Sequence, residues 1–274
     1  MNLSIVIPTF NSWTDVLANF SHLAQFDDRL EVIIVDNARD SIRPNRVPDF
    51  FKVIHEPKPG SYCARNAGIK TAVGRCIYFT DSDCHVPHET INILLELSEN
   101  ATTVHTGPII ITNQGRKSLI TSYDEMFAFD YNAMKKSRTA ITANLLVPRF
   151  YFDSLGLFNS DTFSGGDVQW TRNYSRYHSL VYLDDLRVLH PARRTLQELK
   201  TKARRVVGGR WKTLSVARTT LLVLAPPIRR LQKVLFSNSP LLIKLGLFVL
   251  LTLLKLVEIL ELLRLFVGMP RERL

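Results

Sequence analysis

Two short apolar runs near the start of the chain have the composition of buried β-strands. Residues 3–8 (LSIVIP) end at a proline and residues 31–36 (EVIIVD) end at an aspartate, and both are rich in β-branched side chains. Between them, residues 12–26 carry apolar side chains at helical spacing, with Ser12 where an N-cap is expected. This part of the chain predicts a strand–helix–strand unit.

The alternation of strand and helix patterns continues beyond this unit. The remaining predicted elements are strands at 52–55, 76–80, 103–112 and 140–147 and helices at 61–72 and 88–98. Strands that alternate with helices are typical of an α/β fold with a mostly parallel central sheet flanked by helices.

Polar residues end three of the predicted strands. Thr9, Asp36 and the stretch Asp81-Ser82-Asp83 each follow directly on an apolar run. The carboxyl ends of parallel strands meet at one edge of a sheet, where open α/β proteins bind their ligands. We therefore expect these residues to lie on one rim.

The carboxylates of Asp81 and Asp83 suit a hard divalent cation. In an extended segment residues i and i+2 point to the same side, so both side chains can converge on Mg²⁺ or Mn²⁺. Such an ion is usually completed by substrate phosphates and water, which suits a nucleoside diphosphate. An Asp-rich turn that starts the following helix is the alternative.

The neighbouring Cys84, His85 and His88 suggest a second kind of site, a zinc centre. Structural zinc needs four ligands, normally supplied as two spaced pairs, and the sequence has no matching second pair. We therefore expect Cys84 to be a small core residue and the histidines to be ordinary loop and helix-start residues.

Four motifs stand at the places that the strand pattern marks. They are IVIPTFN at residues 5–11, VDN at 35–37, PGSYCARNAGI at 59–69 and FTDSD at 79–83. In order and spacing they resemble the family 2 glycosyltransferases of GT-A fold, over roughly residues 1–210. The resemblance implies an enzyme that moves one sugar from a nucleotide diphosphate sugar to an acceptor hydroxyl with inversion, using Mg²⁺ or Mn²⁺.

The resemblance also implies a role for the matching positions at the first two strand ends. Pro8, Thr9 and Asn11 would shape the loop against the nucleotide. Asp36 would accept a hydrogen bond from the base of a uridine-type nucleotide, which favours a UDP-sugar donor.

The next two motifs would bind the rest of the donor. Arg65, with Asn66 beside it, would reach the diphosphate or support its loop, and a surface ion pair is the alternative for Arg65. Asp81 would contact ribose or metal, Ser82 would line the nucleotide-sugar site, and Asp83 would be the direct metal ligand.

The later part of the family pattern is present in altered form. The segment SGGDVQW at residues 164–170 stands where the family commonly carries Glu-Asp at a helix start. Gly166 replaces the Glu, which leaves Asp167 as the base that takes the proton of the acceptor hydroxyl. A helix N-cap is the alternative for Asp167, and the two roles are compatible.

Two further positions bear on the mechanism. His190 follows a strand-like stretch and would return to the metal or diphosphate, as a late histidine does in some GT-A enzymes. An ordinary hydrogen-bonded histidine is the alternative. Val207 stands at the Gln position of the Q-x-x-R-W motif of processive members, which disfavours a polymerising synthase.

Positive charge is concentrated in the C-terminal third. Residues 193–274 hold 17 Lys and Arg against 4 Asp and Glu, a net charge of +13, which leaves −3 for residues 1–192. Such a segment binds phosphate groups on nucleic acid or on an anionic membrane surface. Nucleic acid is not expected, because Trp211 is the single aromatic residue among the basic residues 193–235.

Residues 241–267 contain 20 Leu, Ile, Val or Phe residues interrupted by five charged ones. The apolar residues favour membrane insertion and the charges oppose it by a similar amount. This pattern predicts a helix in the membrane interface or a short span, and a helix hairpin packed on the catalytic domain or a dimer seam is the alternative.

We therefore expect residues 1–195 to form the catalytic domain and residues 196–274 a helical membrane-associated region. The three cysteines lack C-x-x-C spacing and no signal-peptide pattern opens the chain, which favours a reduced catalytic part at the cytoplasmic face of the cell membrane. The expected pathway is polysaccharide, glycolipid or lipid-linked glycan synthesis, with an unassigned acceptor. The alternatives are a nucleotidyltransferase and a catalytically degenerate membrane-bound adaptor.

Overall fold

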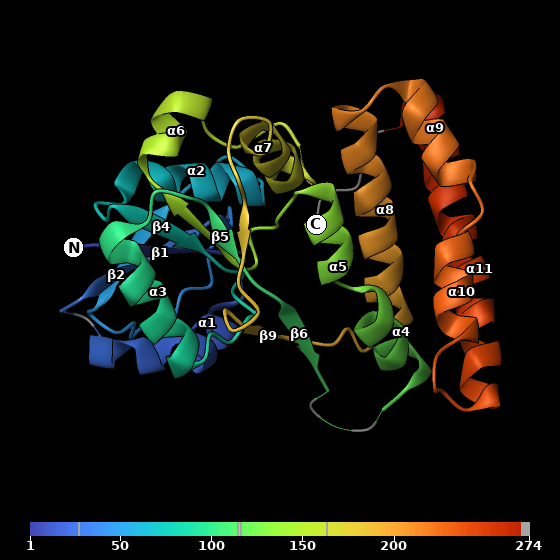
Figure 1. The fold of residues 1–274 in the computed structure, drawn as a ribbon, viewed down its shortest axis with the longest axis horizontal. Helices are drawn as coiled ribbons and strands as arrows, with labels where there is room; N and C mark the ends of the chain where they lie inside the picture. Colours follow the sequence, from blue (N-terminus) through green and yellow to red (C-terminus); the bar gives the residue numbers. More distant parts are fainter. Residues whose placement is uncertain (27, 114, 116, 163, 270–274) are drawn as a thin grey trace. The chain divides into compact units, whose positions relative to one another are not determined.

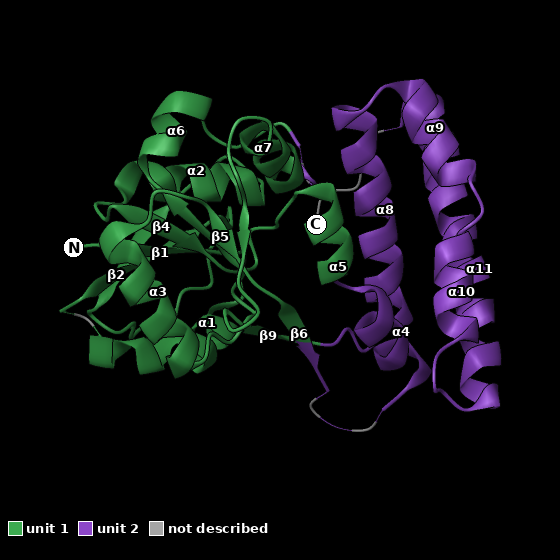
Figure 2. Cartoon of the chain, viewed as in Figure 1, with its two compact units in different colours: residues 1–110, 130–161, 166–191 green, residues 111–129, 162–165, 192–274 purple. Residues whose placement is uncertain are grey.

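The computed structural model describes residues 1–26, 28–113, 115, 117–162 and 164–269 (Figure 1). The chain divides into two compact units, which have different colours in Figure 2. Unit 1 comprises residues 1–110, 130–161 and 166–191, and unit 2 comprises residues 111–129, 162–165 and 192–274. The domain boundary after residue 195 stays a prediction, and residues 270–274 of the predicted C-terminal region lie outside the described residues.

Unit 1 is built around a seven-stranded sheet of order β3-β2-β1-β4-β7-β5-β8. Its strands are β1 (Leu3–Thr9), β2 (Leu30–Asp36), β3 (Phe51–His55), β4 (Cys76–Phe79), β5 (His105–Thr106), β7 (Leu145–Pro148) and β8 (Val181–Tyr182). The strands β1 to β4 run parallel to one another, whereas β7 is antiparallel to β4 and β5. The strands β6 (Ile109–Thr112) and β9 (Val188–Pro191) form a two-stranded sheet. The predicted α/β fold with a mostly parallel sheet is confirmed.

Helices cover both faces of the parallel part of this sheet. The helices of unit 1 are α1 (Trp13–Phe20), η1 (Ser21–Phe26), α2 (Ser61–Thr71), α3 (His88–Asn100), α5 (Tyr131–Ser137), α6 (Phe150–Leu155) and α7 (Gly166–Tyr174). In Figure 1, α2 lies on one side of the strands and α1 and α3 on the other. Gly68 lets α2 approach β1 closely, because a Cβ there would lie 2.3 Å from Cγ1 of Val6.

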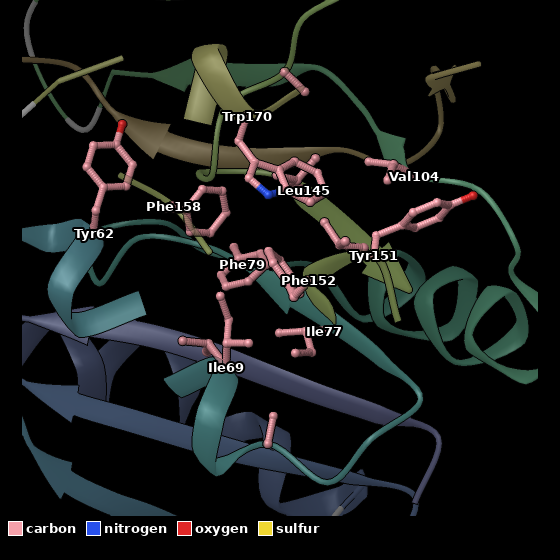
Figure 3. Close-up of a cluster of buried hydrophobic side chains, with 14 of the residues drawn as sticks. Tyr62, Ile69, Ile77, Phe79, Val104, Leu145, Tyr151, Phe152, Phe158 and Trp170 are labelled. Atoms are coloured by element: carbon pink, nitrogen blue, oxygen red, sulfur yellow. The ribbon is translucent and has the colours of Figure 1, made fainter. Parts of the chain in front are cut away.

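An aromatic cluster fixes β4 in the core of unit 1 (Figure 3). Phe79 of β4 contacts Phe152 and Phe158, with ring centroids 5.9 and 5.3 Å apart, and both of these rings contact Trp170 of α7. Burying each such side chain stabilises the fold by about 1.5–3 kcal/mol. The cluster therefore holds the end of β4 and the start of α7, which carry the candidate site.

The helix predicted over residues 12–26 is shorter than expected. The α-helix ends at Phe20, and the chain continues as the 3₁₀-helix η1. Ser12 is not a side-chain cap, because its hydroxyl donates to the carbonyl oxygen of Phe10 at 3.3 Å.

Two predicted strands are also shorter than their apolar patterns. The run 103–112 is divided into β5 and β6 at Gly107-Pro108, where a Cβ on Gly107 would lie 1.8 Å from the carbonyl oxygen of Leu186. Proline donates no backbone hydrogen bond, so the ladder stops there. The run 140–147 begins its strand only at Leu145.

Unit 2 consists mainly of helices. They are α4 (Leu119–Phe127), α8 (Leu196–Thr213), α9 (Val216–Leu224), α10 (Ile228–Leu235) and α11 (Leu241–Phe266). Capping boxes start α4 at Ser118 and α8 at Thr195. The long helix α11 packs against α4, α8, α9 and α10, and its leucines form a core with Tyr123 and Leu199.

Helix α11 also buries two carboxylates within unit 2. Glu258 and Glu261 are 9% and 2% exposed. Glu258 pairs with Lys255 at 3.2 Å and Glu261 pairs with Arg264 at 2.9 Å, one helical turn away in each case. Across the described residues, no helix combines the length and the unbroken apolarity needed to cross a membrane.

Candidate active site

The ends of β1, β2 and β4 lie on one edge of the sheet of unit 1. Thr9 is the register partner of Asp36, and Val6 is the partner of Phe79. Residues 80–83 therefore leave β4 beside the end of β1. The single rim predicted from the three polar strand ends is present.

Asp36 is buried at the end of β2 and already holds two hydrogen-bond donors. Its Oδ1 accepts a hydrogen bond from the backbone N–H of Ala38 at 3.1 Å, and its Oδ2 accepts one from the Ser41 hydroxyl. These contacts fold the loop that follows β2 back over the carboxylate. A carboxylate oxygen has two lone pairs, so each oxygen retains one acceptor position.

The loop after β1 is shaped by Asn11. This residue has a positive φ of 56°, and its Oδ1 accepts a hydrogen bond from the backbone N–H of Ile42 at 3.2 Å. Pro8 is half-buried and Thr9 is buried, and Oγ1 of Thr9 has no hydrogen-bond partner among the described residues. The hydroxyl of Thr9 is therefore a buried polar group without a partner among the described residues at this edge.

Asn37 is a structural residue to which the sequence analysis gave no role. Its Nδ2 donates to the carbonyl oxygens of Glu56 and Lys58 at 2.7 and 2.8 Å, and its Oδ1 accepts from the N–H of Gly60 at 2.8 Å. Gly60 has φ of 130°, which favours glycine. Asn37 thus fixes the loop that leads into α2, and its position directly after a strand-ending Asp was the available signal.

Arg65 and Asp81 form an ion pair between α2 and the end of β4. An Nη atom of Arg65 donates to Oδ1 of Asp81, and the arginine side chain is 5% exposed. The guanidinium also lies 5.6 Å from the centre of the Tyr62 ring. The pair is therefore not the surface contact considered as an alternative. It neutralises Asp81 and leaves Asp83 as the more exposed carboxylate, at 44% against 36%.

Asn66 and Ser82 make contacts that support the loops of the site. The Asn66 amide is bound by the backbone of Phe158, with Nδ2 donating to its carbonyl oxygen at 2.8 Å and Oδ1 accepting from its N–H at 3.1 Å. The carbonyl oxygen of Ser82 accepts from Nδ2 of Asn19 at 3.2 Å. In this structure Asn66 holds the Phe158 segment, and its donor-binding role stays a prediction.

Asp83 and His190 meet beyond the end of β4. Oδ2 of Asp83 lies 3.4 Å from Nε2 of His190, a histidine whose side chain is 6% exposed. Nδ1 of His190 lies 2.7 Å from the carbonyl oxygen of Pro191. Because a carbonyl oxygen only accepts hydrogen bonds, Nδ1 carries a proton, and Nε2 is the ring nitrogen that faces the carboxylate.

Two facing acceptors need a cation or a proton between them. An imidazole that donates from one nitrogen to a backbone carbonyl and offers the other to an ion is the usual arrangement of a metal-binding histidine. Asp83 and His190 are brought together by an antiparallel bridge, in which the backbones of His85 and Leu189 exchange hydrogen bonds at 2.8 and 2.9 Å. These two side chains fit a divalent cation.

Cys84 lies beside this pair without the chemistry of a zinc ligand. Its Sγ and the ligand atoms of Asp83 and His190 are all within 4.8 Å of one another. Burial, with the nearby charges of Asp81 and Asp83, raises the pKa of the Cys84 thiol well above its ordinary value. The thiol would therefore have to release its proton at a cost before it could bind a metal, since only the thiolate binds metal well.

Asp167 begins α7 and is held by four hydrogen bonds. Its Oδ1 accepts from the Tyr62 hydroxyl and from the N–H of Val168, both at 2.8 Å. Its Oδ2 accepts from the N–H and the hydroxyl of Thr142 at 3.0 and 3.2 Å. Both oxygens are thus fully used in this structure, and Gly166 contributes no second carboxylate.

Tyr62 and Thr142 are partners of Asp167 that sequence reasoning missed. Burial, followed by the negative charge of Asp167, raises the pKa of Tyr62 well above its ordinary value, so the phenol remains a donor. Tyr62 lies inside the PGSYCARNAGI motif, whereas Thr142 stands in an apolar run that predicted only a strand. No local signal connects either residue with position 167.

The described geometry can be compared with known proteins. Residues 4–161 match the model of the family described as glycosyl transferase family 2. The chain belongs to glycosyl transferase family 2. The segment that matches this glycosyltransferase family contains Asp36, Arg65, Asp81 and Asp83, whereas Asp167 and His190 lie beyond it.

Glycosyltransferases of other organisms are similar in sequence to this chain. Glycosyltransferase AglE of Haloferax volcanii is 27% identical over 233 residues, which cover 80% of this chain and 76% of AglE. The uncharacterized glycosyltransferase YwdF of Bacillus subtilis is 31% identical over 173 residues, which cover 59% of this chain and 63% of YwdF. The protein is a glycosyltransferase.

Solved structures of similar fold include two with bound nucleotide sugars. One is the mannosyltransferase PcManGT of Pyrobaculum calidifontis in complex with GDP-Man and Mn²⁺, which is 16% identical to this chain with a TM-score of 0.59. The match covers 96% of this chain and 86% of the PcManGT chain. S. aureus TarS in complex with UDP-GlcNAc is 14% identical with a TM-score of 0.52, covering 99% and 93%. These similarities show that the glycosyltransferase has the GT-A fold.

Proposed function

We propose that this glycosyltransferase moves a sugar from a nucleoside diphosphate sugar, with a uridine nucleotide favoured, to an acceptor hydroxyl with inversion. The observation that carries the proposal is the meeting of the Asp83 carboxylate and the His190 imidazole at the end of β4. A carboxylate oxygen and an imidazole nitrogen suit Mn²⁺ or Mg²⁺, and the nitrogen favours Mn²⁺. The Mn²⁺ in the PcManGT complex supports the same choice.

Each rim residue has its own task in this proposal. Asp83, His190 and the neighbouring Asp81 would hold a divalent cation, which would supply positive charge to stabilise the leaving diphosphate. Arg65 holds Asp81 in place and adds a second positive charge on the diphosphate side. Asp36 uses its remaining acceptor positions for the imide N–H of uracil, and Thr9 offers its unpartnered hydroxyl to the nucleotide.

Asp167 accepts the proton of the acceptor hydroxyl in this mechanism. To do so it must exchange one of its four present donors for the acceptor. The hydroxyls of Tyr62 and Thr142 can rotate away, whereas the two backbone N–H groups are fixed by the fold. The backbone donors then keep the carboxylate oriented while the acceptor replaces a hydroxyl.

One observation favours a second candidate function, a catalytically degenerate adaptor. Gly166 stands where the family commonly carries a Glu, and all four donors around Asp167 belong to the protein itself. Such a protein would bind the donor and transfer nothing. The nucleotidyltransferase alternative is set aside, because the chain belongs to a glycosyltransferase family.

We also propose that residues 196–274 associate with the cytoplasmic face of a membrane and that the acceptor is a glycan or lipid-linked glycan. The net charge of +13 in residues 193–274 supports this, as do the large apolar side chains exposed on α9, α10 and α11. Polysaccharide, glycolipid or lipid-linked glycan synthesis would use an enzyme placed there.

The test is a panel of UDP- and GDP-sugars with the full chain and Mn²⁺, measuring donor binding by calorimetry and donor hydrolysis or transfer by product analysis. We expect wild type to bind and turn over a UDP-sugar, Asp167→Asn to bind it with transfer abolished, and the exposed Asp185→Asn control to match wild type. Wild type that binds without turnover would establish the adaptor. Absence of all donor binding, or full transfer by Asp167→Asn, would overturn the mechanism.

A further inference from the structure

A pocket of about 460 Å³ within unit 2 has a cationic wall. Arg210, Arg229, Arg230 and Lys255 line it together with one carboxylate, that of Glu258, and we call it the arginine pocket. Lys255 is paired with Glu258 at 3.2 Å. The three arginines therefore face no second carboxylate among the described residues that line the pocket.

Helix α10 begins in the wall of the arginine pocket and adds backbone donors. Pro226, Pro227 and Ile228 line the pocket, and Pro227 at the helix start brings no side-chain cap. The first N–H groups of an α-helix have no partner within the helix, and the helix dipole favours an anion beside them. The N–H of Ile228 donates to the carbonyl oxygen of Pro226 at 2.9 Å, and the next two residues of α10, Arg229 and Arg230, line the same pocket.

The positive charges in this wall oppose one another. Burial lowers the pKa of Arg210, and Arg230 lowers it further against the opposite effect of Glu258. Arg230 donates to the Tyr123 hydroxyl at 3.4 Å, a neutral partner that leaves its charge uncompensated there. An anion in the pocket would relieve this repulsion, and a phosphate offers two oxygens to the planar, bidentate fork of an arginine.

The apolar part of the arginine pocket continues onto an exposed apolar surface. Leu222 and Ile228 line the pocket and are 42% and 56% exposed. Further exposed apolar side chains on α9, α10 and α11 are Leu221, Leu224, Leu235, Leu245, Val249, Leu256, Leu260 and Leu263. On α11 the exposed residues Leu245, Val249, Leu256, Leu260 and Leu263 follow one another at intervals of four, seven, four and three residues, so they form a stripe along one side of the helix.

We infer that the arginine pocket binds the phosphate of a lipid headgroup while the apolar surface beside it enters the acyl region of an anionic membrane. A free phosphate would satisfy the arginines and leave the leucines in water. A lipid satisfies both, because its phosphate and its chains are joined in one molecule. This inference rests on the proposed membrane association and adds a specific headgroup site to it.

The experiment measures binding of the full chain to vesicles by flotation, with phosphatidylcholine alone and with phosphatidylglycerol added. A basic residue at a headgroup contributes about fivefold to binding, so Arg229→Gln with Arg230→Gln should weaken binding to the anionic vesicles about 30-fold. Arg229→Gln alone keeps the contact of Arg230 with Tyr123. This single variant should weaken binding to the anionic vesicles about fivefold.

Two matched controls separate a headgroup site from diffuse attraction. Lys212→Gln with Arg218→Gln removes the same charge from exposed positions outside the pocket and should change binding by less than about threefold. Arg229→Lys with Arg230→Lys keeps the charge and removes the bidentate fork, and should weaken binding about fivefold.

The outcomes distinguish this inference from the proposal on which it rests. If wild type binds neither kind of vesicle, the membrane association itself is wrong. If wild type binds vesicles and the pocket variants behave like the Lys212 and Arg218 control, the association stands and the headgroup site is refuted. In a third outcome, inorganic phosphate raises the unfolding temperature of wild type, and wild type does not bind anionic vesicles selectively. This outcome would assign the pocket to a free phosphate and would also refute the headgroup site.

Discussion

The two units of this glycosyltransferase use buried charge in different ways. In unit 1, Arg65 and Asp81 are bound at a sheet edge, where each charge fixes a neighbour of the proposed metal site. In unit 2, Glu261 and Arg264 pair along α11 in a leucine core. The first pair lies beside the groups proposed to act on a ligand, whereas the second joins two residues of one helix in unit 2. Burial alone therefore does not identify a charged residue as functional.

The largest expected effect comes from the proposed metal ligands of unit 1. Asp83→Asn and His190→Gln should each lower the transfer rate about 10²–10³-fold, because they remove charge stabilisation. The unfolding temperature should be unchanged in Asp83→Asn and lower in His190→Gln, because the His190 side chain is only 6% exposed. Mn²⁺ binding can be measured by electron paramagnetic resonance in the absence of donor, and it should be weaker in both variants than in wild type. Cys84→Ala should keep Mn²⁺ affinity, and loss of affinity in that variant would make Cys84 a ligand.

The next effect is on stability. Asp81→Asn leaves the buried guanidinium of Arg65 without its carboxylate and should lower the free energy of unfolding by about 1.5–3 kcal/mol, with solvent contact of Asp81 limiting the loss. Chemical denaturation measures this loss in the free energy of unfolding. Adding Arg65→Leu should recover part of that stability while transfer stays lost. A single mutant as stable as wild type would contradict the structural importance of the pair.

The corresponding pair in unit 2 should be replaceable. Arg264→Leu alone should cost about 2 kcal/mol, since Glu261 is almost fully buried, and Glu261→Leu with Arg264→Leu should return the protein to wild-type stability or above. Transfer activity should be retained in the double variant. If the double variant loses activity while remaining folded, the contrast between the two units fails.

The smallest effect is a pH dependence of unit 2. Burial, together with the charge of Arg193, lowers the pKa of Lys202 from 10.5 to about 7. Between these values the unfolded chain binds a proton that the folded chain has released, so the free energy of unfolding rises with pH from about 7 upward. Lys202→Met should remove this rise, whereas Lys200→Met on the same helix should keep it. Equal slopes in the two variants would contradict the assignment.

The sheet edge of unit 1 was predictable because its signals are local. A β-branched run that ends in a polar residue places that residue at a strand end, and Thr9, Asp36 and Asp81 were found in this way. The family resemblance predicted that His190 returns to the metal site, whereas residue spacing could not predict its pairing with Asp83. The bridge between His85 and Leu189 joins segments that are distant in the sequence. No sequence signal identified Thr142 as a partner of Asp167, because Thr142 lies in the irregular segment before β7 and its contact with Asp167 joins residues that are distant in the sequence.

The helices of unit 2 were less predictable. In α11 apolar residues lie on both the buried and the exposed side, so the helical period does not distinguish a core face from a membrane face. The charged residues of α11 predicted a helix in the membrane interface or a short span, whereas Glu258 and Glu261 are buried in ion pairs. The packing of α4 with α11 joins residues that are far apart in the sequence, and nothing in residues 119–127 indicated it.

The bridge between His85 and Leu189 also has a consequence for biosynthesis. During translation the strand ends that carry Thr9, Asp36 and Asp83 leave the ribosome well before β9, which carries His190. A polypeptide released between these points contains most of the nucleotide rim and lacks the imidazole. Retention of Mn²⁺ would therefore report that the chain has been synthesised through β9 and that β9 has docked.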